Sequence, residues 1–157
     1  MAASNVFERL RSPAEVRVTV PAPPAAVFAV LSDPETYPDW LAGAQSIRRV
    51  DDDFPAEGSG FDHEVGPTEA VTVADRSEVR AADGPNRLVL EVHAGPLKGI
   101  AEFELERIAD GTLVTLRERI TGPLGAAMPL LRGPIFLRNR WSLDRLRQRF
   151  TPLVVRL

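Results

Sequence analysis

Apolar and polar residues alternate along several short segments of the chain, a period-two pattern typical of half-buried β-strands. In the segment 15–20, Val16, Val18 and Val20 share one face while polar side chains share the other. The same pattern, bounded by Gly, Pro or Asp, predicts further strands over 46–51, 61–65, 68–80, 87–93, 100–107 and 112–120. Short turns such as Asp110-Gly111 join neighbouring segments, so about seven mostly antiparallel strands are expected.

Two short helices are predicted directly after the first strand, because prolines stand where a helix can begin. Pro24 can occupy the first turn of a helix over 25–31, where its missing N–H costs nothing. Asp33 can cap a second helix that begins at Pro34. Pro38 then keeps this second helix short.

One long amphipathic helix is predicted near the C-terminus. Residues recur there at spacings of three and four, which gives an inward stripe of Phe136, Leu137, Arg140, Leu143, Leu146 and Phe150. The segment before it, 122–134, is apolar but contains several Gly and Pro residues. We expect a short helix there and a kink at Arg132-Gly133-Pro134.

The length of 157 residues allows a single domain, 1–157, with its core in about 15–150. The chain has no cysteine, which excludes disulfides and thiolate chemistry. No apolar run approaches the roughly 18 residues of a membrane span. The first ten residues lack the apolar core of a secretory signal, so a cytoplasmic location is expected.

The charge is unevenly distributed. The net charge is −3, yet residues 130–157 hold seven arginines and one acidic residue. We expect this basic helix to pack on the acidic remainder of the chain with its charged groups in solvent. Docking of the helix to a membrane surface or to nucleic acid is the less favoured interpretation, because the net charge is negative.

The opening of the chain resembles a known family. The segments 16–28 and 33–40, the latter reading Asp-Pro-Glu-Thr-Tyr-Pro-Asp-Trp, are similar to the opening of polyketide cyclase/dehydrase-like proteins of the START/Bet v 1-like superfamily. The resemblance extends over about 15–150. It implies an α+β helix-grip fold, in which a curved antiparallel sheet wraps around a long C-terminal helix and encloses an apolar cavity. Members bind lipids, sterols, plant hormones, polyketides or quinone-like molecules, and a minority are cyclases or aromatases.

Two polar residues stand on predicted inward faces and are the candidate catalytic groups, together with Arg140 of the helix stripe. His63 shares a face with Phe61 and Val65, and Glu118 shares one with Leu116. A carboxylate on an apolar face should be paired or have a raised pKa. The alternatives are a core histidine satisfied by a neighbour, and a Glu118 that pairs with Arg140 or Arg147 or points outward after a register slip.

Apolar and aromatic residues on the same faces are the candidate ligand contacts: Tyr37, Trp40, Phe61, Val73, Leu90, Phe103, Leu116, Phe136 and Leu143. The first hypothesis is therefore a protein that binds a hydrophobic small molecule, such as a polyketide, a lipid or a quinone.

Two further functions stay open. The first is a polyketide cyclase or aromatase in which His63 or Glu118 abstracts a proton and Arg140 or Arg49 stabilises the enolate. The second is a protein that docks a partner through its basic helix. No cofactor and no metal site are expected, since His63 and His93 lie far apart and on opposite predicted faces. We expect no nucleic-acid partner, no membrane insertion, and a monomer or homodimer.

Overall fold

A computed structural model describes residues 12–152 and shows a curved, seven-stranded antiparallel sheet in the order β1-β7-β6-β5-β4-β3-β2. The strands are β1 (Ala14–Val20), β2 (Ala44–Val50), β3 (Gly60–Thr68), β4 (Val71–Asp83), β5 (Arg87–Ala94), β6 (Leu97–Ile108) and β7 (Gly111–Thr121). The helical segments are α2 (Pro24–Leu31), η1 (Pro34–Thr36), α3 (Tyr37–Trp40), η2 (Gly122–Ala127) and α4 (Met128–Gln148). This is the α+β helix-grip arrangement that the sequence predicts.

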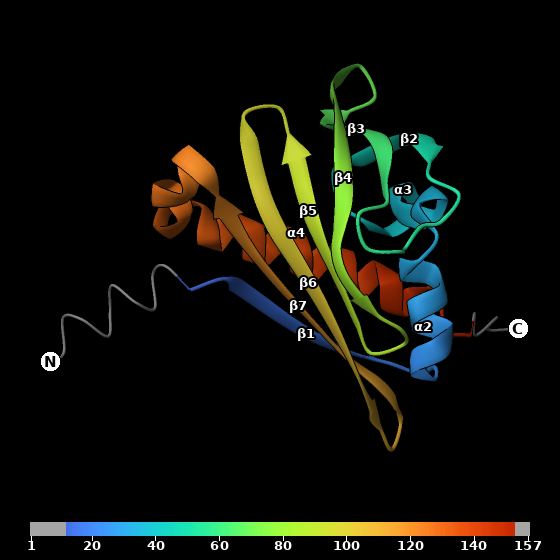
Figure 1. Ribbon diagram of the computed structural model, residues 1–157. Helices are drawn as coiled ribbons and strands as arrows, with labels where there is room; N and C mark the ends of the chain where they lie inside the picture. The colour runs from blue at the N-terminus through green and yellow to red at the C-terminus, as the bar shows by residue number, and fades with distance from the viewer. Residues whose placement is uncertain (1–11, 153–157) are drawn as a thin grey trace, which may run out of the picture.

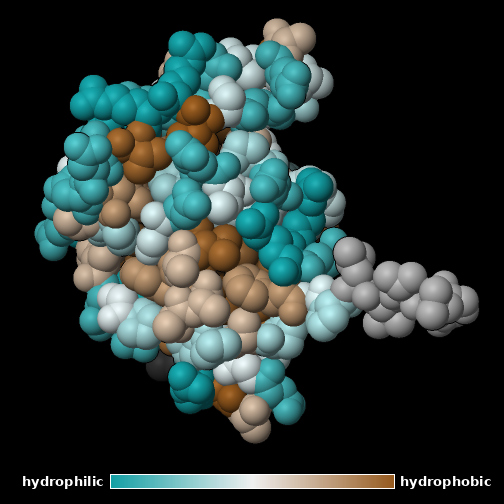
Figure 2. Space-filling model, turned by 90° about the vertical axis from the view of Figure 1, so that its right-hand side faces the viewer, coloured by the Kyte–Doolittle hydropathy of each residue, from teal (hydrophilic) through white to brown (hydrophobic). Residues whose placement is uncertain are grey.

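The long helix α4 crosses one face of the sheet, α3 lies beside β2, and α2 follows the end of β1 and contacts β6 and β7 (Figure 1). Because β1 pairs with β7, the first and last strands lie side by side, and α4 packs mainly against β1. Figure 2 looks onto the side where α2 lies and shows apolar surface gathered in its middle, in keeping with the mostly apolar sequence of α2. Among residues 12–152, no helix is long and apolar enough to cross a membrane.

The strand boundaries differ from the prediction where β3 and β4 meet. Gly66-Pro67 does not end β3, which continues to Thr68, and β4 begins only at Val71. The ladder is irregular between Val65 and Thr68, which lets the proline remain in the strand. A Cβ on Gly66 would lie 1.9 Å from the Val71 carbonyl oxygen, so only glycine allows this close approach.

The long helix begins earlier than predicted, at Met128, and runs through Gly133 and Pro134. Pro134 cannot donate a hydrogen bond to the carbonyl of Leu130, one turn earlier. Both Leu130 and Pro134 are exposed, so water can satisfy that carbonyl. A proline on the solvent side therefore does not end this helix.

The inward face of α4 is also rotated relative to the predicted stripe. Its buried residues are Met128, Ile135, Asn139, Ser142, Leu143 and Leu146. The stripe was wrong for Phe136, Leu137 and Arg140, which are exposed. The reason is that the two buried polar side chains have partners. Asn139 donates to Glu118, and Ser142 accepts from the Ala42 N–H at 3.0 Å, so facing the sheet leaves neither unsatisfied.

The Asp-Pro-Glu-Thr-Tyr-Pro-Asp-Trp segment anchors the two short helices in the core. Asp33 accepts the Glu35 N–H, and the Tyr37 hydroxyl donates to the Leu31 carbonyl at 2.6 Å. The fully buried Trp40 donates from its indole to Thr36 at 3.2 Å and meets the rings of Tyr37 and Phe103 edge-on. The motif that carries the family resemblance is therefore structural.

Candidate functional site

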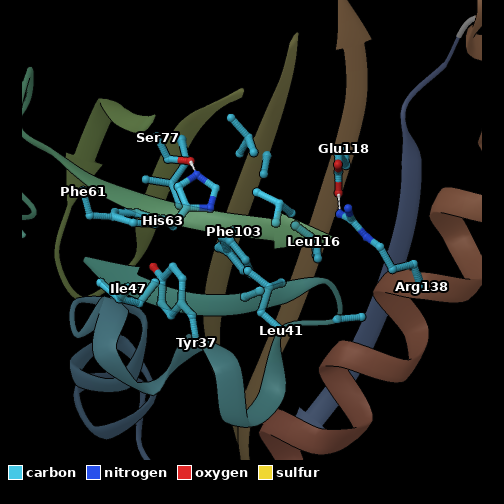
Figure 3. A pocket seen from close by; sticks show the side chains of 16 residues that line it. Tyr37, Leu41, Ile47, Phe61, His63, Ser77, Phe103, Leu116, Glu118 and Arg138 are labelled. Atoms are coloured by element: carbon cyan, nitrogen blue, oxygen red, sulfur yellow. Dashed lines mark hydrogen bonds and ion pairs between the residues drawn. The ribbon is translucent and has the colours of Figure 1, made fainter. Parts of the chain in front are cut away.

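A small pocket of about 60 Å³ lies on the inner face of the sheet, between β2–β7, the loop after α3, and one side chain of α4 (Figure 3). Its walls are mainly apolar and include Leu41, Ile47, Val65, Val92 and Ala101, with the aromatic rings named below. Its polar side chains are those of His63 and Ser77, contributed by β3 and β4, and of Glu118 and Arg138, contributed by β7 and α4. The Tyr37 hydroxyl is already hydrogen-bonded to Leu31, and burial raises the pKa of this phenol.

His63 and Ser77 form the first polar pair. Phe61 pairs with Ser77 across β3 and β4, so these two side chains share the inner face of the sheet. His63 is two residues after Phe61 in β3 and therefore points to the same face. The Ser77 hydroxyl lies 3.0 Å from Nε2 of His63. Burial lowers the pKa of His63, opposed by the nearby carboxylates of Asp75 and Asp62, so the imidazole is neutral at pH 7. Within residues 12–152, Nδ1 has no hydrogen-bond partner and is available to a ligand.

Glu118 and Arg138 form the second polar pair. Nearly buried, Glu118 accepts from the Arg138 guanidinium and, at 2.9 Å, from the Asn139 amide. Arg138 also donates to the Asn139 Oδ1, which closes a three-residue network. Glu118 thus points inward, as its strand position predicts, but it is paired. The contact with the Arg138 guanidinium is a charge-assisted one.

The partner of Glu118 is Arg138, and not Arg140 or Arg147 as the predicted stripe indicated. Arg140 is exposed and lies 3.5 Å from Asp144 of its own helix. Arg147 faces the same Asp144 at 4.0 Å. A helix turns about 100° per residue, so the rotated phase that buries Asn139 brings Arg138 to the pocket and carries Arg140 away.

Five of the nine predicted ligand contacts line the pocket: Tyr37, Phe61, Leu90, Phe103 and Leu116. Trp40 and Leu143 are fully buried in the core and do not line it. Val73 and Phe136 are 50% and 39% exposed and lie outside it. Val73 lies beyond Glu78–Glu91, where the β4–β5 ladder ends.

Ser77 and Arg138, the polar lining residues that pair with His63 and Glu118, were not candidates from the sequence. Ser77 continues the β4 face of Val79, and that alternation was the available signal. Arg138 could be found only after the phase of α4 was known. In the described chain, 12–152, no three His, Asp or Glu side chains gather in a group that could hold a metal ion.

The lowered pKa of His63 predicts a pH-dependent stability. The unfolded chain, with its ordinary histidine pKa of 6.5, binds the proton more readily than the folded protein. Stability is therefore full above about pH 6.5 and falls as the pH drops below that value. We expect His63→Gln to flatten this loss between pH 7 and 5 in denaturant titrations. His93→Gln keeps His63 and should retain the loss, and an unchanged slope in His63→Gln would contradict the assignment.

Comparison with solved structures supports the same fold. A protein of Rhodobacter sphaeroides is 17% identical with a TM-score of 0.71, covering 88% of this chain and 91% of that one. A protein of Chromobacterium violaceum is 16% identical with a TM-score of 0.71, covering 90% and 99%. The di-domain ARO/CYC StfQ of the steffimycin biosynthetic pathway is 14% identical with a TM-score of 0.67, covering 94% of this chain and 53% of that one.

No protein of curated function matches the chain. The family described as polyketide cyclase/dehydrase and lipid transport matches residues 13–151, nearly the whole chain. That match agrees with the sheet, the long helix and the pocket between them. The chain belongs to the polyketide cyclase/dehydrase and lipid transport family.

Proposed function

We propose that this protein binds a hydrophobic small molecule, such as a polyketide, a lipid or a quinone, in the pocket between the sheet and α4. The observation that carries the proposal is the pocket's composition, with apolar walls and two polar pairs. Apolar surface supplies the binding free energy, and Nδ1 of His63 and the Arg138 guanidinium fix the orientation of a ligand's oxygen atoms. Membership of a family that includes lipid transport supports the same function.

We infer that the ligand enters between β4 and β5, beyond the point where the two strands stop pairing. Sites for drug-sized ligands measure roughly 300–1,000 Å³, so a pocket of about 60 Å³ must widen to hold one. Beyond Glu78–Glu91, β4 and β5 share no ladder, and the β3–β4 hairpin stands apart from the β5–β6 hairpin (Figure 1). Asp75 spans this gap by accepting the Gly95 N–H at 2.8 Å. Moving the β3–β4 hairpin outward breaks this contact and leaves the β4–β5 ladder intact.

The experiment is native mass spectrometry of the freshly purified protein, with organic extraction of whatever co-purifies. A ligand seated in the pocket should be lost from Ala101→Leu, because the new isobutyl group fills the free space beside Phe103 and Leu90. We expect at least a tenfold loss of affinity for the extracted compound, which corresponds to about 1.4 kcal/mol.

Ala82→Leu is the matched control, since it makes the same change at an exposed position of β4. It should bind the compound like the original protein. Equal binding by Ala101→Leu, with its fold intact by circular dichroism, would move the ligand out of this pocket.

A cyclase-like activity is the second candidate, favoured by one observation: the neutral His63 keeps Nδ1 free on an apolar wall. In the tautomer that carries its proton on Nε2 and donates it to Ser77, Nδ1 is unprotonated and can take a proton from the carbon next to a ketone. The pairing of Arg138 with Glu118 weighs against it, because the cation that would stabilise an enolate is already neutralised. Conversion of a poly-β-ketone probe to a cyclised product, followed by mass spectrometry, separates an enzyme from a carrier.

A further inference from the structure

The solvent side of α4 carries a second line of apolar side chains. Leu130, Leu137 and Trp141 are 82%, 68% and 48% exposed. Their spacings of seven and four place them on one face of the helix, opposite the buried Ile135 and Leu146. Exposed apolar residues are normally scattered singly, whereas a contiguous group indicates an interaction surface. We call Leu130, Leu137 and Trp141, with the arginines described next, the outer face of α4.

Arginines flank this apolar line on both sides. Arg145 lies along one side and Arg140 and Arg147 along the other, as the 100° turn per residue requires. The guanidinium of Arg145 lies 4.4 Å from the centre of the Trp141 ring. Asp144 is the single acidic residue of the helix sequence 128–148, and it faces Arg140 and Arg147. The outer face therefore combines apolar and cationic groups with little negative charge.

We propose that the outer face of α4 docks on an anionic lipid surface, with the helix lying in the plane of the interface. Leucine side chains then enter the boundary between headgroups and acyl chains, and Trp141 occupies the interfacial layer that tryptophan prefers. The arginines bind the lipid phosphates, a match of charge as well as of polarity. A helix that lies flat needs no membrane span.

A second copy of the chain is the poorer occupant. Packing two outer faces together sets arginines against arginines. Several acidic side chains of the sheet are already engaged in ion pairs: Glu15 and Glu104 pair with Arg117, and Asp62 pairs with Arg76. The sequence-based preference for a solvated helix rested on the negative net charge of the chain. The observed helix phase exposes two leucines and a tryptophan beside the arginines, which favours docking over a purely solvated helix.

The test is sedimentation of the full chain with vesicles of phosphatidylcholine alone or mixed equally with phosphatidylglycerol. We expect binding to the anionic vesicles, a blue shift of Trp141 emission, and at least tenfold weaker binding to neutral vesicles. Leu137→Glu should lower the partition coefficient at least tenfold. Arg140→Glu combined with Arg145→Glu should lower it by about the same factor and reduce its dependence on salt.

Val71→Glu is the matched control, because Val71 is 62% exposed on β4 and lies off the outer face. It should bind vesicles normally. Binding that ignores lipid charge, no binding, or an equal loss in Val71→Glu would overturn the proposal. So would a dimer that Leu137→Glu dissociates, or a Trp141 that acrylamide cannot quench without vesicles. Thermal unfolding confirms that each variant is folded, so that a loss of binding reports the surface.

Discussion

Replacing Trp40 with alanine is expected to lower the free energy of unfolding by about 3–5 kcal/mol. Trp40 is fully buried where α3 meets the sheet, with its ring centre 5.2 Å from that of Tyr37 and 6.3 Å from that of Phe103. Its removal leaves a cavity between these rings and breaks the hydrogen bond to Thr36. Denaturant titration measures the loss, and for a domain of this size each kcal/mol shifts Tm by roughly 2–4 °C.

The other tryptophan provides the matched control. Trp141 is 48% exposed on α4, so Trp141→Ala should change stability by less than about 0.5 kcal/mol. Trp40→Phe keeps a ring in place and should cost less than Trp40→Ala. If the two alanine variants proved equally stable, the Asp-Pro-Glu-Thr-Tyr-Pro-Asp-Trp segment would have no anchoring role, and its recurrence in the family would need a functional explanation.

The strands and their inner faces could be predicted from the sequence because alternation is a local property. Phe61, His63, Leu90, Phe103, Leu116 and Glu118 all face inward as their neighbours in the same strand indicate. Alternation also predicts an inward Val73, because this residue is an even number of positions from Ser77 and Val79. Val73 is instead exposed and lies beyond the end of the β4–β5 ladder. Whether a strand end is covered depends on the neighbouring strand, and that information is not local.

The phase of α4 could not be predicted from hydrophobicity, because this helix has apolar residues on two faces. Side-chain type alone does not separate Phe136 and Leu137 from Ile135 as inward residues. The decision was made by the polar residues Asn139 and Ser142, which find Glu118 and the Ala42 N–H only when they face inward. The phase of α4 therefore depends on partners roughly 20 and 100 residues away in sequence, which a local pattern does not contain. For this reason the sequence indicated Arg140, and not Arg138, as the arginine of the site.

Arg138→Ala is expected to lower the free energy of unfolding by about 1–3 kcal/mol, since it leaves the buried Glu118 with Asn139 as its remaining partner. Breaking a fully buried ion pair costs about 3–5 kcal/mol, but 41% of the Arg138 side chain is exposed and solvent screens the loss. Arg140→Ala, two residues along the same helix, removes an exposed contact to Asp144 and should cost less than about 0.5 kcal/mol.

A double-mutant cycle between Glu118→Gln and Arg138→Ala isolates the pair itself. Residues in direct contact should give a coupling free energy of about 0.5–3 kcal/mol, whereas Glu118→Gln and Arg140→Ala should be additive. Denaturant titrations without lipid or ligand measure both cycles, so the result is independent of any binding function. Coupling to Arg140 in place of Arg138 would mean that the originally predicted stripe faces the sheet. The inner polar network and the outer face of α4 would then both be misplaced, because one helix phase determines the two together.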